Sequence, residues 1–79
     1  MQRGRETVIQ IDGQLMTEGV VELERLCAAA PRPLTLELAG LSTIDRDGRR
    51  ALHALADQGI RLVGASPYIE LLLKHQRDR

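Results

Sequence analysis

The side chains most able to take part in chemistry gather in one short stretch of the sequence, Asp45-Arg46-Asp47-Gly48-Arg49-Arg50. This stretch opens an amphipathic segment, so Asp45 is placed to accept a backbone hydrogen bond as the N-cap of a helix. Positive charge is disfavoured at that end of a helix, yet three arginines stand there. One interpretation is an electrostatic docking surface for an acidic patch on a partner. The other is a solvated helix face on which Asp45 and Asp47 act as local counter-charges.

The remaining reactive residues are isolated from one another. Ser42 and Thr43 are either phosphate acceptors or loop hydroxyls that bond to the backbone. His53 and His75 lack a second ligand at helical spacing, so we expect no metal site. Cys27 falls on an apolar stripe, which indicates a buried thiol. Because the sequence has no phosphate-binding glycine motif and no nucleophile beside a base, we expect no cofactor and no enzymatic activity.

The composition narrows the classes of function further. The 79 residues include 11 basic and 11 acidic side chains, one Tyr, no Trp, no Phe and one Cys. A neutral chain without aromatic stacking groups is not typical of a nucleic-acid-binding protein. A single Cys excludes an intramolecular disulfide and indicates a reducing, cytoplasmic location. We expect one domain over residues 1–79, with no apolar run long enough for direct membrane insertion.

The neutral total conceals an uneven distribution of charge along the chain. Residues 6–45 carry seven acids and two bases, whereas residues 46–79 carry seven bases and four acids. The chain is therefore dipolar, and its arginines gather where the basic part begins.

Along the chain, segments whose apolar residues have the spacing of a strand alternate with segments whose apolar residues have the spacing of a helix. The sequence predicts strands over 7–11, 34–38 and 60–63, helices over 17–30, 46–58 and from 67 onward, and a connecting loop over 39–44. Short connections in this order indicate parallel strands joined by right-handed crossovers. We therefore expect an α/β fold, with a small, mainly parallel sheet of three to four strands packed with about three helices.

Local signals mark the ends of these elements. Asp12-Gly13 is predicted to stop the first strand, and Gly59 the second helix. Thr17, Asp45 and Ser66 are predicted to cap the three helices. Lys74, His75 and Arg77 would place positive charge at the end of the last helix, where the dipole favours it. The residues expected to face the core recur every three or four positions: Val20, Leu23, Cys27 and Ala30; Ile44, Gly48, Ala51, Leu52 and Leu55; Ile69, Leu72, Leu73 and Gln76.

Several stretches of the chain match the motifs of one family in the right order. They are Val8-Ile9-Gln10-Ile11-Asp12-Gly13-Gln14-Leu15, Glu37-Leu38-Ala39-Gly40-Leu41, Ile44-Asp45-Arg46-Asp47-Gly48, Arg49-Arg50-Ala51-Leu52 and Gly59-Ile60-Arg61-Leu62-Val63-Gly64-Ala65-Ser66-Pro67. Together they resemble the STAS domain family, which includes the anti-sigma factor antagonists and related domains of sulfate transporters. The resemblance spans residues 7–74 and implies a βαβαβα fold.

The resemblance implies a protein-interaction module with a phosphorylation switch, and this chain departs from the family at the switch. In the antagonists, the serine before the glycine of "DSSG" is phosphorylated by the anti-sigma factor, an ATP-dependent kinase, and the phosphate weakens binding. Asp47 matches that serine and Arg46 matches the serine before it, so neither residue accepts phosphate from a serine kinase. Asp47 is then either a partial mimic of the phosphate or a first-turn acid, and Ser42 and Thr43 are the alternative acceptors.

These matches imply a non-enzymatic regulator that binds an anti-sigma factor or regulatory kinase in a bacterial partner-switching circuit that controls transcription. Its partner-binding residues would be Asp45, Arg46, Asp47, Gly48, Arg49 and Arg50. The alternative is a structural STAS subunit that docks on the ATPase of a phospholipid ABC transporter through the same helix.

Family members also have an earlier strand, which pairs antiparallel with the strand matched here by residues 8–15. Only six residues precede Thr7, so we expect that strand to be absent or vestigial and an edge of the sheet to be exposed. An unpaired edge favours pairing with another chain. The expectation is a homodimer, or a partner that covers this edge.

Overall fold

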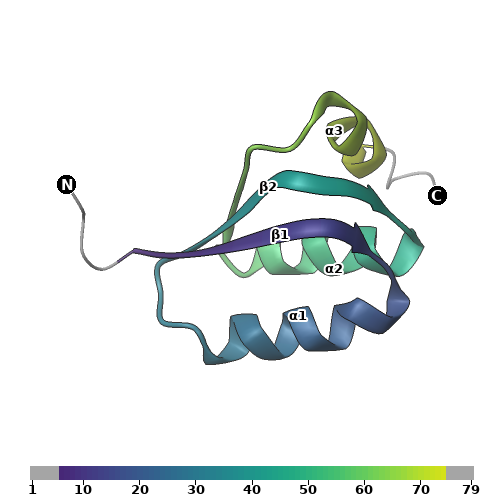
Figure 1. The fold of residues 1–79 in the computed structure, drawn as a ribbon. Coiled ribbons are helices and arrows are strands. Elements are labelled where there is room, and N and C mark those ends of the chain that lie inside the picture. The colour runs from purple at the N-terminus through teal and green to yellow at the C-terminus, as the bar shows by residue number, and fades with distance from the viewer. Residues whose placement is uncertain (1–5, 75–79) are drawn as a thin grey trace.

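The computed structural model describes residues 6–74, in which three strands alternate with three helices (Figure 1). The elements are β1 (Thr7–Leu15), α1 (Thr17–Ala29), β2 (Leu34–Ile44), α2 (Arg46–Asp57), β3 (Arg61–Val63) and α3 (Pro67–Lys74). All pairings in the sheet are parallel, in the order β1-β2-β3. The predicted α/β fold and the predicted order of elements are confirmed.

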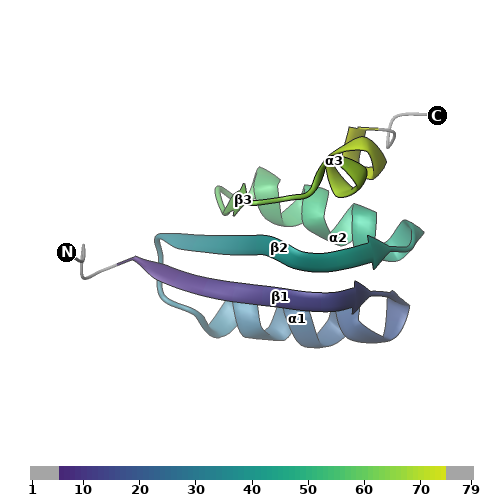
Figure 2. The ribbon, with the colours of Figure 1, turned by 45° about the horizontal axis from the view of Figure 1, so that its top comes forward.

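Helices α1 and α2 lie side by side on one face of the sheet (Figures 1 and 2). The third strand is short, and α3 follows it near the end of β2, where it packs against both β2 and α2. One face of the sheet is thus covered by α1 and α2. On the opposite face, Val8, Gln10 and Val63 are exposed to solvent.

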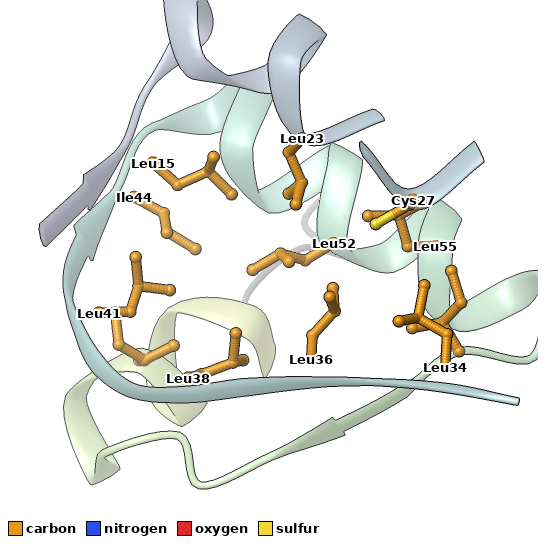
Figure 3. Packing of buried hydrophobic residues seen from close by; sticks show 12 residues of the cluster. Leu15, Leu23, Cys27, Leu34, Leu36, Leu38, Leu41, Ile44, Leu52 and Leu55 are labelled. Carbon is orange, nitrogen blue, oxygen red and sulfur yellow. The ribbon is translucent and has the colours of Figure 1, made fainter. Parts of the chain in front are cut away.

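The core lies between β2 and the helices (Figure 3). Leu34, Leu36 and Leu38 alternate along β2 and are almost completely buried, because alternate side chains of a strand point to the same face. Leu23 and Cys27 of α1 pack onto this row, together with the buried side chains of α2 and α3. The helix faces predicted from three- and four-residue spacing are confirmed, apart from Gln76, which lies outside the described residues.

Two predicted strand ends are wrong. β1 continues through Asp12-Gly13 to Leu15, and β2 continues through the predicted loop to Ile44. The two strands stay paired over this whole length, with two shifts of register, one between Gln10 and Asp12 and one between Gly13 and Gln14. Each shift inserts an extra β2 residue, so β2 loses its simple alternation although its strand pairing persists.

The predicted ends of the later elements agree with the structure. Gly59 follows α2 with a φ of 94°, a conformation that glycine adopts without steric cost. The Ser66 hydroxyl accepts a hydrogen bond from the Ile69 N–H at 3.2 Å, which caps α3. Lys74 lies in the last turn of α3, whereas the predicted basic residues His75 and Arg77 lie outside the described residues.

Within residues 6–74, β1 has β2 as its only strand neighbour, so its other edge is unpaired there (Figure 2). None of the three helices of this part of the chain combines the length and apolar content needed to cross a membrane.

Candidate protein-interaction site at the start of α2

The Asp45 carboxylate joins the first turns of two helices. One of its oxygens, Oδ1, accepts a hydrogen bond from the Gly48 N–H at 2.8 Å, which confirms Asp45 as the N-cap of α2. The other, Oδ2, accepts hydrogen bonds at 2.9 Å from both the backbone N–H and the hydroxyl of Thr17, at the start of α1. A single side chain therefore satisfies backbone donors that each helix would otherwise leave without a partner.

The prediction that Thr17 is the N-cap of α1 is wrong. Thr17 is the first helical residue, and Met16, in the cap position, makes no side-chain capping hydrogen bond. The cap is supplied instead by Asp45, 28 residues away along the chain. Methionine has no side-chain oxygen for this role, which explains why α1 depends on a distant carboxylate.

Asp47 takes part in the same cluster from the first turn of α2. Its Oδ2 accepts a hydrogen bond from the Thr17 hydroxyl at 2.9 Å, and its side chain is partly buried. The Thr17 hydroxyl thus lies between the carboxylates of Asp45 and Asp47. Separations of 28 and 30 residues along the chain leave no local sequence pattern that would associate Thr17 with this site.

These hydrogen bonds affect the acidity of Asp45. The Gly48 N–H bond is the largest cause that holds the pKa of Asp45 below its ordinary value of 3.8, and the Thr17 N–H and hydroxyl act in the same direction. Desolvation raises the pKa and is the second-largest cause, smaller than the Gly48 bond but larger than either Thr17 bond. The cluster is therefore built around an ionised Asp45.

The arginines of the predicted docking stretch lie on the outside of the same turn. Arg46 and Arg50 are exposed, and Arg49 is partly buried. Within residues 6–74, the Asp45 and Asp47 carboxylates accept hydrogen bonds from Thr17 and Gly48. Both acids therefore interact with the two helix starts, and Arg46 and Arg50 lie exposed beside them.

A groove of about 380 Å³ runs between α1 and α2 and reaches this cluster. Its walls combine small apolar side chains with polar and charged ones: Thr17, Val20, Val21, Glu24, Asp47, Arg50, Ala51 and Ala54. Thr17, Asp47 and Arg50 therefore border one hollow, and the predicted docking surface continues into it.

Gly48 sets how closely α2 approaches the end of β1. A Cβ at this position would overlap the Leu15 carbonyl oxygen, which also accepts a hydrogen bond from the Asp45 N–H at 3.2 Å. Gly48 therefore belongs to the site because it lets the backbone of α2 approach β1 closely.

The two predicted alternative phosphate acceptors lie on β2. The Ser42 hydroxyl is exposed and donates a hydrogen bond to the Gly13 carbonyl oxygen at 2.8 Å, across one of the register shifts. Thr43 is partly buried and pairs with Gln14 of β1. The Ser42 bond is the backbone contact expected of a structural hydroxyl.

His53 and Cys27 each make contacts that stabilise the fold. The His53 Nε2 lies 2.8 Å from the Leu73 carbonyl oxygen, which joins α2 to α3. Cys27 is buried, and this burial raises the pKa of its thiol. In the part of the chain that the structure describes, no three His, Cys, Asp or Glu side chains are arranged to hold a metal ion. His75 lies outside that part.

Comparison of the chain with known protein families, with curated proteins and with solved structures finds no match.

Proposed function

We propose that this chain is a non-enzymatic protein-interaction module of the STAS type, which binds an anti-sigma factor or regulatory kinase through the start of α2. The observation that carries the proposal is the division of charge in that turn. Asp45 and Asp47 bond to the two helix starts, while Arg46 and Arg50 remain exposed beside them. A rigid turn with outward guanidinium groups suits an acidic partner surface.

The rigidity of this turn is as relevant to binding as its charge. Asp45 fixes the backbone of α2 relative to α1, and the Leu15 carbonyl fixes it relative to β1. A surface held in one conformation loses less entropy on binding than a mobile loop does. The start of α2 would therefore be a pre-organised docking surface for a protein partner.

The Asp47 carboxylate suggests that binding is not switched by phosphate at this position. Asp47 cannot accept phosphate from a serine kinase, and it is hydrogen-bonded to Thr17. The same observation favours a second candidate function, a structural subunit that docks on the ATPase of a phospholipid ABC transporter. A permanent subunit needs no switch, whereas a regulator of this kind would need its switch elsewhere, for example at Ser42 or Thr43.

The experiment compares binding of purified candidate partners to two charge-reversal variants. Arg46→Glu with Arg50→Glu should weaken binding at least tenfold, because repulsion replaces attraction at the docking surface. Arg25→Glu with Arg61→Glu is the matched control, since it makes the same change in charge at exposed positions of α1 and β3. Equal affinities for the two double variants would overturn the proposed surface. An anti-sigma factor as the partner that binds supports the first function, and a transporter ATPase supports the second.

A companion experiment tests the switch. The Asp47→Ser variant, incubated with ATP and the candidate kinase, should incorporate phosphate at position 47. The original chain should incorporate none there. Phosphate on Ser42 or Thr43 of the original chain would locate the switch in β2.

A further inference from the structure

The outer edge of β1 is a second surface that is suited to binding. β1 is nine residues long, and within residues 6–74 only its β2 side is paired (Figure 2). The other side leaves backbone N–H and C=O groups without strand partners. Such an edge is a template for the addition of another extended segment.

A groove of about 280 Å³ follows this edge, between β1 and α1. Its apolar lining includes Ile9 and Ile11, which are partly buried, and Leu26, which is 50% exposed. An added strand that places alternate apolar side chains in this groove would cover all three of these residues. The edge therefore offers both main-chain hydrogen bonds and an apolar floor.

The charges around the groove indicate what kind of strand fits. Its charged lining residues are Asp12 and Glu22, and both are acidic. Residues 6–30, which contain β1 and α1, carry five acids and one base, a net charge of −4. A second copy of this chain would bring an edge of the same charge against this one, which is unfavourable. A basic strand would be attracted instead.

We propose that the β1 edge binds an extended protein segment in which apolar residues alternate with Lys or Arg. The apolar side chains occupy the groove against Ile9, Ile11 and Leu26. The basic side chains between them point to the opposite face of the sheet, where Asp12 follows Val8 and Gln10 in the alternation of β1. The segment adds to the sheet as a fourth strand beside β1. This site is independent of the docking surface on α2, so either proposal stands if the other fails.

The test uses a capped heptapeptide, Val-Lys-Val-Lys-Val-Lys-Val, titrated into the full chain while backbone amides are followed by NMR. We expect the largest shifts at Val8, Ile9 and Ile11. A peptide N-methylated at alternate residues keeps its charge and side chains but loses main-chain donors, so it should bind at least tenfold more weakly. Asp12→Lys should weaken binding severalfold, because it replaces the acid on the face of β1 to which the peptide lysines point. Glu24→Lys, on the side of α1 that lines the groove toward α2, is the matched control and should not.

Three results would overturn the proposal. Equal affinity for the plain and N-methylated peptides would mean that binding is by charge alone, without strand addition. No binding at millimolar peptide would mean that the edge does not accept this kind of segment. A dimer at low micromolar concentration in sedimentation, dissociated by the peptide, would mean that a second copy occupies the edge.

Discussion

The starts of α1 and α2 share an acid followed by a glycine, but different groups accept their first hydrogen bonds. α1 begins Thr17-Glu18-Gly19 and α2 begins Arg46-Asp47-Gly48, so each has an acid at the second helical position and a glycine at the third. The Gly19 N–H donates to the Met16 backbone carbonyl at 2.8 Å. The Gly48 N–H donates to the Asp45 side chain at the same distance. The third residue of α1 therefore bonds to a backbone carbonyl, whereas the third residue of α2 bonds to a side-chain cap.

This difference shows that the two helix starts are not equivalent in what they contribute. Asp45 caps its own helix and also receives the Thr17 N–H of the other, whereas Met16 contributes no side-chain cap to either. The glycines differ too. A Cβ on Gly19 would lie 3.7 Å from the Leu15 side chain, an ordinary contact, whereas a Cβ on Gly48 would overlap the Leu15 backbone. The α2 start therefore organises the junction, and the α1 start depends on it.

The largest expected effect comes from giving each glycine a side chain. Ala is preferred over Gly within a helix by about 1 kcal/mol, so Gly19→Ala should stabilise the protein by up to about that amount. Gly48→Ala should instead destabilise it by about 1–3 kcal/mol, because the new methyl group collides with a backbone that cannot move aside. Urea unfolding of the two variants measures both changes. Changes of the same sign would show that the two helix starts are packed alike.

The second prediction concerns Asp45, which accepts hydrogen bonds from the starts of both helices. Asp45→Ala, which removes both acceptor oxygens, should lower stability at neutral pH, by less than Gly48→Ala. It should expose the amides of both Thr17 and Gly48 to faster hydrogen exchange, because both bond to the carboxylate. Asp47→Asn, which leaves these two amide bonds in place, is the control. Faster exchange at Gly48 alone would mean that α1 does not depend on Asp45.

The pH dependence of stability follows from the lowered pKa of Asp45. A carboxyl whose pKa is lower in the folded state stabilises that state fully above its unfolded pKa, and loses this contribution as pH falls through the folded value. The loss should therefore begin near the ordinary value of 3.8 and continue below it. In Asp45→Asn this part of the acid destabilisation should be missing. Thermal unfolding between pH 2.5 and pH 6 compares the two chains.

The same junction shows what sequence patterns could and could not predict. Asp45 as the cap of α2 was predictable, because it and Gly48 are three residues apart and the helix period begins between them. Its bond to Thr17 was not, because a contact across 28 residues depends on how β1 and β2 pair. Thr17 was predicted as a cap from its residue type, but the fold places a stronger acceptor beside it.

The sequence pattern does not predict the full length of β2, for a related reason. The alternation Leu34, Leu36, Leu38 predicted its first half, but the next buried residues are Leu41 and Ile44, at spacings of three. Each extra residue of a register shift changes which face the following side chain points to. A period of two therefore disappears from the sequence although the strand continues. The order of elements and the core faces remained readable because they depend on local spacing.

The smallest effect is expected from removing the Thr17 hydroxyl, which joins the two helix starts. Thr17→Val keeps the shape of the side chain and the backbone bond to Asp45, but removes the donor shared by Asp45 and Asp47. Thr17 is exposed, so the loss should be under about 1 kcal/mol. Combined with Asp47→Ala, which removes the acceptor, it should cost less than the sum of the two single changes, because the pair loses one bond between them. Ser42→Val combined with Asp47→Ala is the control, since the Ser42 hydroxyl bonds to Gly13. If the effects of the Thr17 pair were as additive as those of the Ser42 pair, the hydroxyl would not couple the helices. The start of α1 would then depend on α2 only through the hydrogen bond from the Thr17 N–H to the Asp45 carboxylate.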